Sequence, residues 1–175
     1  GREVLDGVDY TREEFYSVLS NAKQIPTHAQ LNTFQFEEAY AAAWQEGYDA
    51  IIYTCINFKG SNTGNNAIQA KDLFFQEHPE AEGKFEIYVL DSKAYTYAYG
   101  YAVVEAAKRA QAEDISAAQA VEQIQDWLDH VKILFTLYDL KFARKSGRVS
   151  AAAAIMGGAM GIRPIMSFPN GDSKV

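Results

Sequence analysis

Two short apolar runs constrain the fold of this chain most. They are Ala50–Ile56 and Phe85–Leu90, and each is followed by polar residues and then by a helical pattern. The first run is rich in β-branched side chains, as strands are when a parallel sheet buries both of their faces. Helical and strand patterns alternate from Phe34 to about Leu137. This alternation predicts an α/β fold, a mainly parallel sheet flanked by helices, with the two runs as adjacent central strands.

Capping signals and apolar spacing place the helices. Thr11–Glu14 has the T-x-x-E form of a capping box, and Ser116–Gln119 has the S-x-x-Q form. Helices are expected after both boxes, from Thr33 or Phe34 to about Glu46, from about Ala67 through Phe74, and from Tyr97 to Ala112.

The pattern changes after Leu137. Ile133–Leu137 is a third strand candidate, followed by a short helix after Asp139, a helix Ala151–Met160, a strand Arg163–Phe168 and a turn Pro169–Asp172. We therefore predict an α/β domain at residues 1–137 and the beginning of a second, α+β domain at residues 138–175. The last strand resembles half of a hairpin, so the second domain is expected to be truncated.

The loop Asn57–Asn66 joins the first strand to a helix, and it is the main candidate for a binding site. Loops of this kind lie beyond the carboxyl end of a strand, where the free N–H groups of a helix N-terminus favour an anion. Ser61, Asn62 and Thr63 add side-chain donors. The alternative is a plain strand-to-helix turn, because the same residue types are common caps and turn formers. Asp91 and Ser92 end the second strand in the same way, and there a cap on the next helix is more common than acid–base catalysis.

Composition and spacing exclude several classes of function. The net charge of −7 and pI of about 5.0 exclude nucleic acid as the main partner, since no positive field displaces phosphate counterions. Ala151–Ile162 is too short to be a transmembrane segment. His78 and His130 lack the spacing of metal ligands, so no metal is expected. Cys55 is the only cysteine and lies in an apolar strand, which indicates a core residue and a cytoplasmic location.

Five short motifs occur in order along the chain. Ile56–Ala67 lies without a gap on the pattern I-S-S-x-L-S-G-T-Y-x-x-A and matches it at Ile56, Ser61, Thr63 and Ala67. The other motifs are E-E-F-Y at 13–16, V-L-D-S at 89–92, K-S-G-R-V-S at 145–150 and G-I-R-P-I at 161–165. Together they resemble the DegV family of bacterial lipid-binding proteins, whose corresponding motifs are E-E-F-Y, V-I-D-S, K-G-G-R-I-S and N-I-K-P-I.

The resemblance implies a fatty-acid-binding protein that is not itself an enzyme. Family members bind one long-chain fatty acid between an α/β domain and a second α+β domain, and two hydroxyl-bearing loops hold the carboxylate. Some present the lipid to a fatty acid kinase. The bound fatty acid would be the ligand, and no other cofactor is implied. The implied lipid-binding residues are Thr27, His28, Asn57, Ser61, Asn62, Thr63 and Ser92, with Arg148 as a contact for the partner.

The chain also departs from the family pattern. The T-S-Q-P loop appears here as His28-Ala29-Gln30-Leu31, so two hydroxyl donors are replaced. Asn57 and Phe58 stand where the motif has paired serines, and Asn62 replaces the glycine of S-G-T. The first strand of the family is absent, so the chain is expected to be an internal fragment.

Two other functions stay open at this point. The first is a hydrolase in which Ser61 is the nucleophile and His28 its base, although the chain has no G-x-S-x-G elbow. The second is an interaction domain with a vestigial pocket.

Overall fold

The computed structural model describes residues 2–5, 7–24, 26–137 and 165–175, and its central element is a parallel pair of strands. Strand β1 (Ala50–Cys55) pairs with β2 (Glu86–Asp91), with Ala50 opposite Glu86 and Cys55 opposite Asp91. The pairing extends at both ends through backbone hydrogen bonds, from Glu86 N to Asp49 O (2.9 Å) and from Ser92 N to Cys55 O (3.1 Å). The prediction of two adjacent parallel strands is therefore confirmed.

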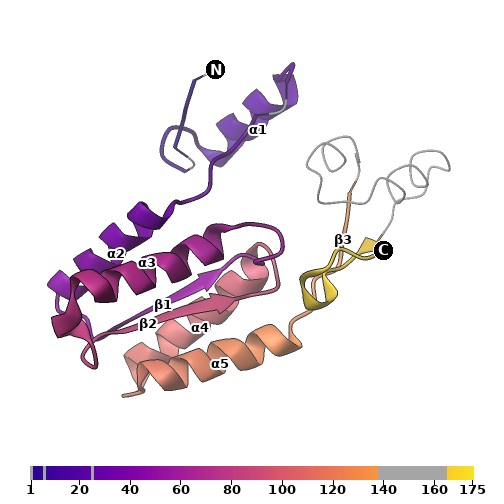
Figure 1. Cartoon of the computed structure of the whole chain (residues 1–175). Helices are drawn as coiled ribbons and strands as arrows, with labels where there is room; N and C mark the ends of the chain where they lie inside the picture. Colours follow the sequence, from indigo (N-terminus) through magenta and orange to yellow (C-terminus); the bar gives the residue numbers. More distant parts are fainter. Residues whose placement is uncertain (1, 6, 25, 138–164) are drawn as a thin grey trace.

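Two pairs of helices cover the two faces of this sheet (Figure 1). Helices α2 (Thr33–Gln45) and α3 (Thr63–Glu77) pack on one face, and α4 (Tyr97–Ala112) and α5 (Ala117–His130) pack on the other. A 3-10 turn, Pro79–Ala81, follows α3. Because side chains of a strand alternate between faces, Ile51 of β1 packs with α2 and α3, whereas Ile52 packs with α4 and α5.

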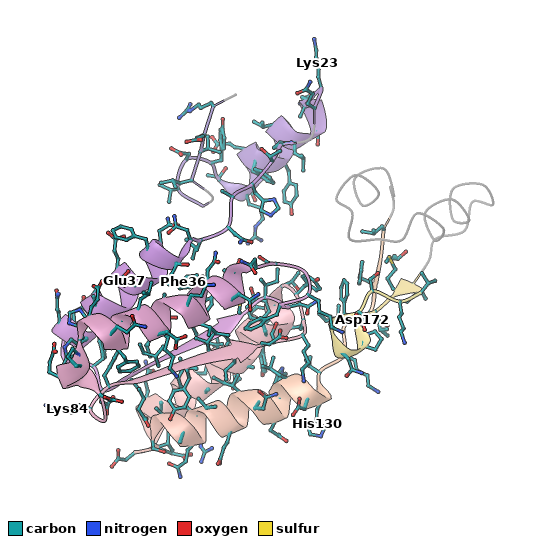
Figure 2. The ribbon with its side chains drawn as sticks, viewed as in Figure 1. Lys23, Phe36, Glu37, Lys84, His130 and Asp172 are labelled. Carbon is teal, nitrogen blue, oxygen red and sulfur yellow. The ribbon has the colours of Figure 1, made fainter. Side chains whose placement is uncertain are left out.

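The larger core lies between the sheet and the pair α2–α3. It combines aromatic rings with small alanines that let the helices approach closely, namely Phe36, Tyr40, Ala67, Ala70, Phe74, Ala81, Phe85 and Ile87. The second core contains Ala102, Ala106, Ile124 and Leu128. The side chains in Figure 2 fill the spaces between the helices and the sheet in the same two layers.

Helix α1 (Arg12–Asn21) stands apart from both layers (Figure 1). Its capping box forms as predicted, since the side chain of Glu14 accepts from Thr11 N (2.8 Å) and the Thr11 hydroxyl accepts from Glu14 N (3.3 Å). None of its residues is buried. The box rather than packing therefore defines where this helix begins.

The third strand candidate, Ile133–Leu137, forms a strand in part but does not join the parallel sheet. Of this range only Phe135–Thr136 forms a strand, β3, and it pairs antiparallel with β4 (Ile165–Met166). The last strand, for which the sequence predicts no partner, is therefore paired with β3. The reason is chain direction. Helices α4 and α5 are consecutive and packed together, so α5 ends at the carboxyl edge of the sheet, where a parallel strand would end rather than begin (Figure 1).

The remaining predictions for the second domain fall partly outside the described residues. The helix after Asp139, the helix Ala151–Met160 and Arg148 lie there. The predicted turn at Pro169–Asp172 is a 3-10 turn, Pro169–Gly171, in which Asn170 and Gly171 both have positive φ. The boundary between residues 137 and 138 stays a prediction.

The burial of Tyr40 leads to a testable prediction about folding stability at alkaline pH. Its side chain is 1% exposed, its hydroxyl donates to Ala67 O (3.2 Å), and burial raises its pKa to about 12. Burial also raises the pKa of Tyr53 and of Cys55. A raised folded pKa means that the neutral phenol stabilises the fold below the unfolded pKa of about 10, and that this stability is lost as the pH rises toward about 12.

We therefore expect the free energy of unfolding to fall between pH 10 and pH 12, with a contribution from Tyr40 on the order of 2 kcal/mol. Urea unfolding at pH 8, 10 and 11.5 measures this loss. Tyr40→Phe should unfold more easily at pH 8, because it lacks the hydrogen bond, but should lose less stability at high pH. An equal alkaline loss in both proteins would contradict the assignment.

Candidate functional site

The two loops that follow β1 and β2 meet at the carboxyl edge of the sheet, as neighbouring parallel strands require. Asn57 N donates to Ala94 O (3.0 Å). The carboxylate of Asp91 accepts from Phe58 N (3.1 Å) and Lys93 N (2.9 Å) through the same oxygen, Oδ1. Asp91 thus joins the two loops, and the expectation that it caps the next helix is wrong because α4 begins only at Tyr97.

The helices that follow these two loops differ from the others in how they begin. Complete capping boxes start α1, α2 and α5, with Thr11, Asn32 and Ser116 as the N-caps. No side chain caps the first turn of α3 or α4 from the N-cap position. The two uncapped N-termini therefore both lie at the edge where α/β sheets bind their ligands.

Asn62 holds the N-cap position of α3 without capping it. Its side chain bonds to neighbouring side chains instead. Asn62 Oδ1 accepts from Asn65 Nδ2 (2.8 Å), and Asn62 Nδ2 donates to Asn66 Oδ1 (3.1 Å). Within the described residues no acceptor meets the backbone N–H of Gly64 or Asn65. Such open N–H groups, together with the helix dipole, favour an anion at this position.

Two hydroxyls lie beside this helix start. The oxygens of Ser61 and Thr63 are 2.6 Å apart, and Ser61 Oγ also accepts from Thr63 N (3.3 Å). The Ser61 hydroxyl donates to Gln30 Oε1 (3.1 Å), which belongs to the loop before α2. Thr63 is buried and Ser61 is half-buried, so the cluster lies at the border between the core and solvent.

The loop that carries Gln30 is fixed to the start of α3. Asn66 Nδ2 donates to Leu31 O (2.7 Å), and the Thr33 hydroxyl donates to Gln69 Oε1 (3.4 Å). Thr27 and His28 lie on this same loop with exposed side chains that hydrogen-bond no other described residue. The structure thus brings together the two loops that the sequence singled out.

Asn57 and Ser92 are buried and already have partners. Asn57 Nδ2 donates to Gly171 O (2.7 Å) and to the Tyr95 hydroxyl (3.0 Å). The Ser92 hydroxyl donates to Ala94 O and accepts from Ala94 N, both at 3.1 Å. Their polar groups hold the loops in place, so Ser61 and Thr63 are better placed than these two to meet a ligand.

The C-terminal segment packs against the same edge. Phe168 contacts the ring of Tyr95 at a centroid distance of 4.4 Å and stacks on Phe135 at 5.1 Å. Lys59 Nζ forms an ion pair with Asp172 (3.0 Å). The sequence had not predicted that this segment reaches the strand-end loops.

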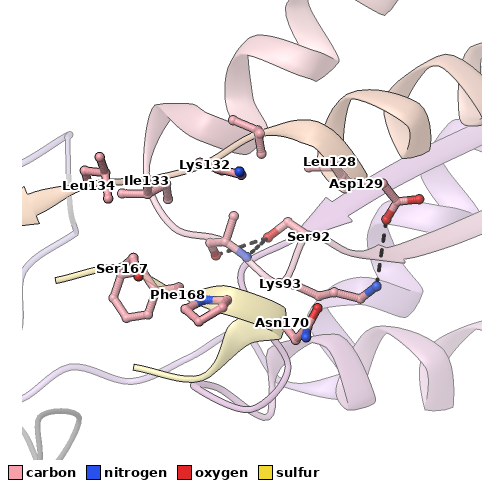
Figure 3. Close-up of a pocket in the computed structure, with 13 residues that line it drawn as sticks. Ser92, Lys93, Leu128, Asp129, Lys132, Ile133, Leu134, Ser167, Phe168 and Asn170 are labelled. Atoms are coloured by element: carbon pink, nitrogen blue, oxygen red, sulfur yellow. Dashed lines mark hydrogen bonds and ion pairs between the residues drawn. The ribbon is translucent and has the colours of Figure 1, made fainter. Parts of the chain in front are cut away.

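A cavity of about 330 Å³ lies between this segment, the loop after β2 and the end of α5 (Figure 3). Leu128, Ile133 and Phe168 give it apolar walls. Lys93 at its rim forms an ion pair with Asp129 (3.9 Å). Its volume is at the lower end of the range for small-molecule sites.

The geometry does not support the hydrolase alternative. The Ser61 hydroxyl contacts Gln30 and Thr63, neither of which can serve as a general base, and it makes no hydrogen bond to His28. In the part of the chain that the structure describes, no three potential ligands gather to hold a metal ion. None of the helices described is long and apolar enough to cross a membrane.

Comparison with known proteins gives consistent matches. A family model described as "Uncharacterised protein, DegV family" matches residues 1–175. A DegV domain-containing protein of Caldanaerobacter subterraneus subsp. tengcongensis is 29% identical over 175 residues, which are 100% of this chain and 59% of that protein.

Solved structures match over most of the chain as well. A fat acid (stearic acid)-binding protein from Eubacterium ventriosum has a TM-score of 0.77 and 25% identity, covering 97% of this chain and 56% of that one. The fatty acid kinase B3 protein of Streptococcus pneumoniae, loaded with linoleic acid, has a TM-score of 0.77 and 21% identity, covering 93% of this chain and 55% of that one. The chain thus spans less than two thirds of the length of these relatives.

Proposed function

The chain belongs to the DegV family, and we propose that it binds a long-chain fatty acid whose carboxylate lies at the start of α3. The observation that carries this proposal is the uncapped N-terminus of α3 beside the hydroxyls of Ser61 and Thr63. A carboxylate there would accept from backbone N–H groups and from a hydroxyl, and such charge-assisted bonds are the strong ones. Hydrogen bonds from the same groups would stabilise an uncharged head group much less.

The energetics of a buried fatty acid require such a site. About fourteen buried methylenes at roughly 0.8 kcal/mol each give on the order of 10 kcal/mol before the costs of association. A carboxylate that enters with the chain loses its hydration, which is costly unless hydrogen-bond donors replace the water. We assign this replacement to Ser61, Thr63 and the first-turn N–H groups, with Asn62, Thr27 and His28 at the rim.

The remaining implied residues have narrower roles in this proposal. Asn57 and Ser92 shape the site by holding its loops, since their own polar groups are engaged within the chain. The chain performs no chemistry on the lipid. Solved relatives are a stearic-acid-binding protein and a fatty acid kinase B3 protein, so a kinase that receives the lipid is the proposed partner, with Arg148 as its contact.

Mass spectrometry of the purified protein tests this function. We expect an organic extract of the chain expressed in bacteria to contain a long-chain fatty acid in roughly equimolar amount. The reason is that a fatty acid with a buried alkyl chain should stay bound during purification. The stearic-acid-binding protein from Eubacterium ventriosum, prepared in the same way, is the positive control. A lipid-free chain that also fails to bind added palmitic acid, beside a loaded control, would contradict the proposal and favour an interaction domain.

A further inference from the structure

The proton arrangement around Ser61 depends on a residue outside the loop that contains it. A hydroxyl has one proton to donate and two lone pairs that can accept. In the structure the Ser61 proton goes to Gln30 Oε1 (3.1 Å). Because Ser61 and Thr63 oxygens are 2.6 Å apart and share one proton, the Thr63 proton must then point to Ser61. With the Gln30 oxygen in this position, neither hydroxyl has a proton left for a ligand.

Rotation of the Gln30 amide reverses this arrangement. The amide carries an acceptor oxygen and a donor nitrogen of nearly equal size, and its terminal torsion has two broad minima. With Nε2 toward Ser61, Gln30 and Thr63 N together fill the two lone pairs of Ser61 Oγ. The Ser61 proton then turns to Thr63 Oγ1, and the Thr63 proton becomes available to a ligand. Gln30 is exposed, so its amide has room to turn, while the backbone beside it is held by the bond from Asn66 Nδ2 to Leu31 O (2.7 Å).

We infer that Gln30 is a specificity-determining residue for the head group of the bound lipid. Its amide nitrogen, turned toward Ser61, releases a hydroxyl proton for a carboxylate, and the amide oxygen withdraws that proton in the unliganded chain. The inference rests on the proposed function and deepens it. It explains how two hydroxyls that are fully hydrogen-bonded within the chain can still bind an anion.

Substitution of Gln30 by glutamate separates this role from a structural one. Glutamate has the same shape but no N–H to donate, and its charge opposes a second carboxylate. We expect Gln30→Glu to weaken the binding of palmitic acid at pH 8 by about tenfold or more, and to leave the binding of hexadecan-1-ol within about twofold. The loss for the acid should shrink toward pH 5, where one proton can be shared between the two carboxyl groups.

Gln30→Met neither accepts the Ser61 proton nor donates to Ser61, so acid binding should change much less than in Gln30→Glu and without this pH dependence. Gln111→Glu adds the same charge at an exposed position of α4 and is the matched control, which should bind both lipids as the unsubstituted chain does. Urea unfolding of each variant shows whether it is folded. Equal losses for acid and alcohol in Gln30→Glu, or unchanged acid binding, would overturn the inference. Failure of the unsubstituted chain to bind either lipid would instead overturn the proposed function.

Discussion

Gly64→Ala is expected to destabilise the protein by about 3 kcal/mol, the upper part of the range for overpacking a tight site. Gly64 is buried in the first turn of α3, under the ring of Phe58. A Cβ atom built on it would lie 2.5 Å from Phe58 Cδ1 and closer still to Cε1 and Cζ. The backbone of Phe58 is held by the bond from its N–H to Asp91 Oδ1 (3.1 Å), so the ring can make room only by leaving its side-chain rotamer.

The effect of Gly64→Ala on folding stability should have the opposite sign when the Phe58 ring is absent. In a Phe58→Ser background the three atoms nearest to the new methyl group are gone, and alanine is preferred over glycine in helices by up to about 1 kcal/mol. Gly64→Ala should therefore stabilise that background slightly. A double-mutant cycle by urea unfolding measures the coupling, which we expect to reach about 3 kcal/mol. Additive effects of the two substitutions would show that the ring does not control this position.

This pair also accounts for a departure from the family motif. The pattern I-S-S-x-L-S-G-T-Y-x-x-A has serine where this chain has Phe58 and tyrosine where it has Gly64. The aromatic residue of the motif at position 64 is thus replaced by glycine, and an aromatic residue stands at position 58 instead. Phe58 now covers the start of α3, and a small residue at position 64 is what allows this.

Features with a local physical cause could be predicted from the sequence. The runs Ala50–Ile56 and Phe85–Leu90 are strands because their side chains suit burial on both faces, and their pairing follows from the helices between and after them. The boxes at Thr11 and Ser116 begin helices because their partners lie three residues away. The loop Asn57–Asn66 could be predicted as a candidate site because it directly follows a strand and leads into a helix.

Contacts between distant segments could not be predicted in this way. The bond from Asn57 to Gly171 O joins residues 114 positions apart, and the bond from Ser61 to Gln30 joins residues 31 apart. The sequence predicts Asn57 as a ligand contact, but it does not reveal that the Asn57 amide donates to Gly171 O of the C-terminal segment. Ile133–Leu137 has a strand-like composition, but the direction in which α5 ends decided its pairing.

Ser61→Ala is the variant with the largest expected effect on lipid binding. If the Ser61 hydroxyl donates to the carboxylate, its removal should weaken the binding of palmitic acid by roughly 1.5–3 kcal/mol, the value of a hydrogen bond to a charged group. Folding stability should fall by about 0.5–2 kcal/mol, because Ser61 Oγ also accepts from Thr63 N at the start of α3. Ser116→Ala, which removes the capping box of α5, is the control for a loss of stability alone.

The most direct test of a carboxylate site at α3 is a titration of the unsubstituted chain and of Ser61→Ala with palmitic acid and with hexadecan-1-ol. We expect the unsubstituted chain to prefer the acid, and Ser61→Ala to lose about ten- to a hundredfold of its affinity for the acid while keeping its affinity for the alcohol. Ser116→Ala should keep both affinities. Equal losses for acid and alcohol, or acid binding unchanged in a less stable Ser61→Ala protein, would contradict this assignment and leave Ser61 as part of the helix start only.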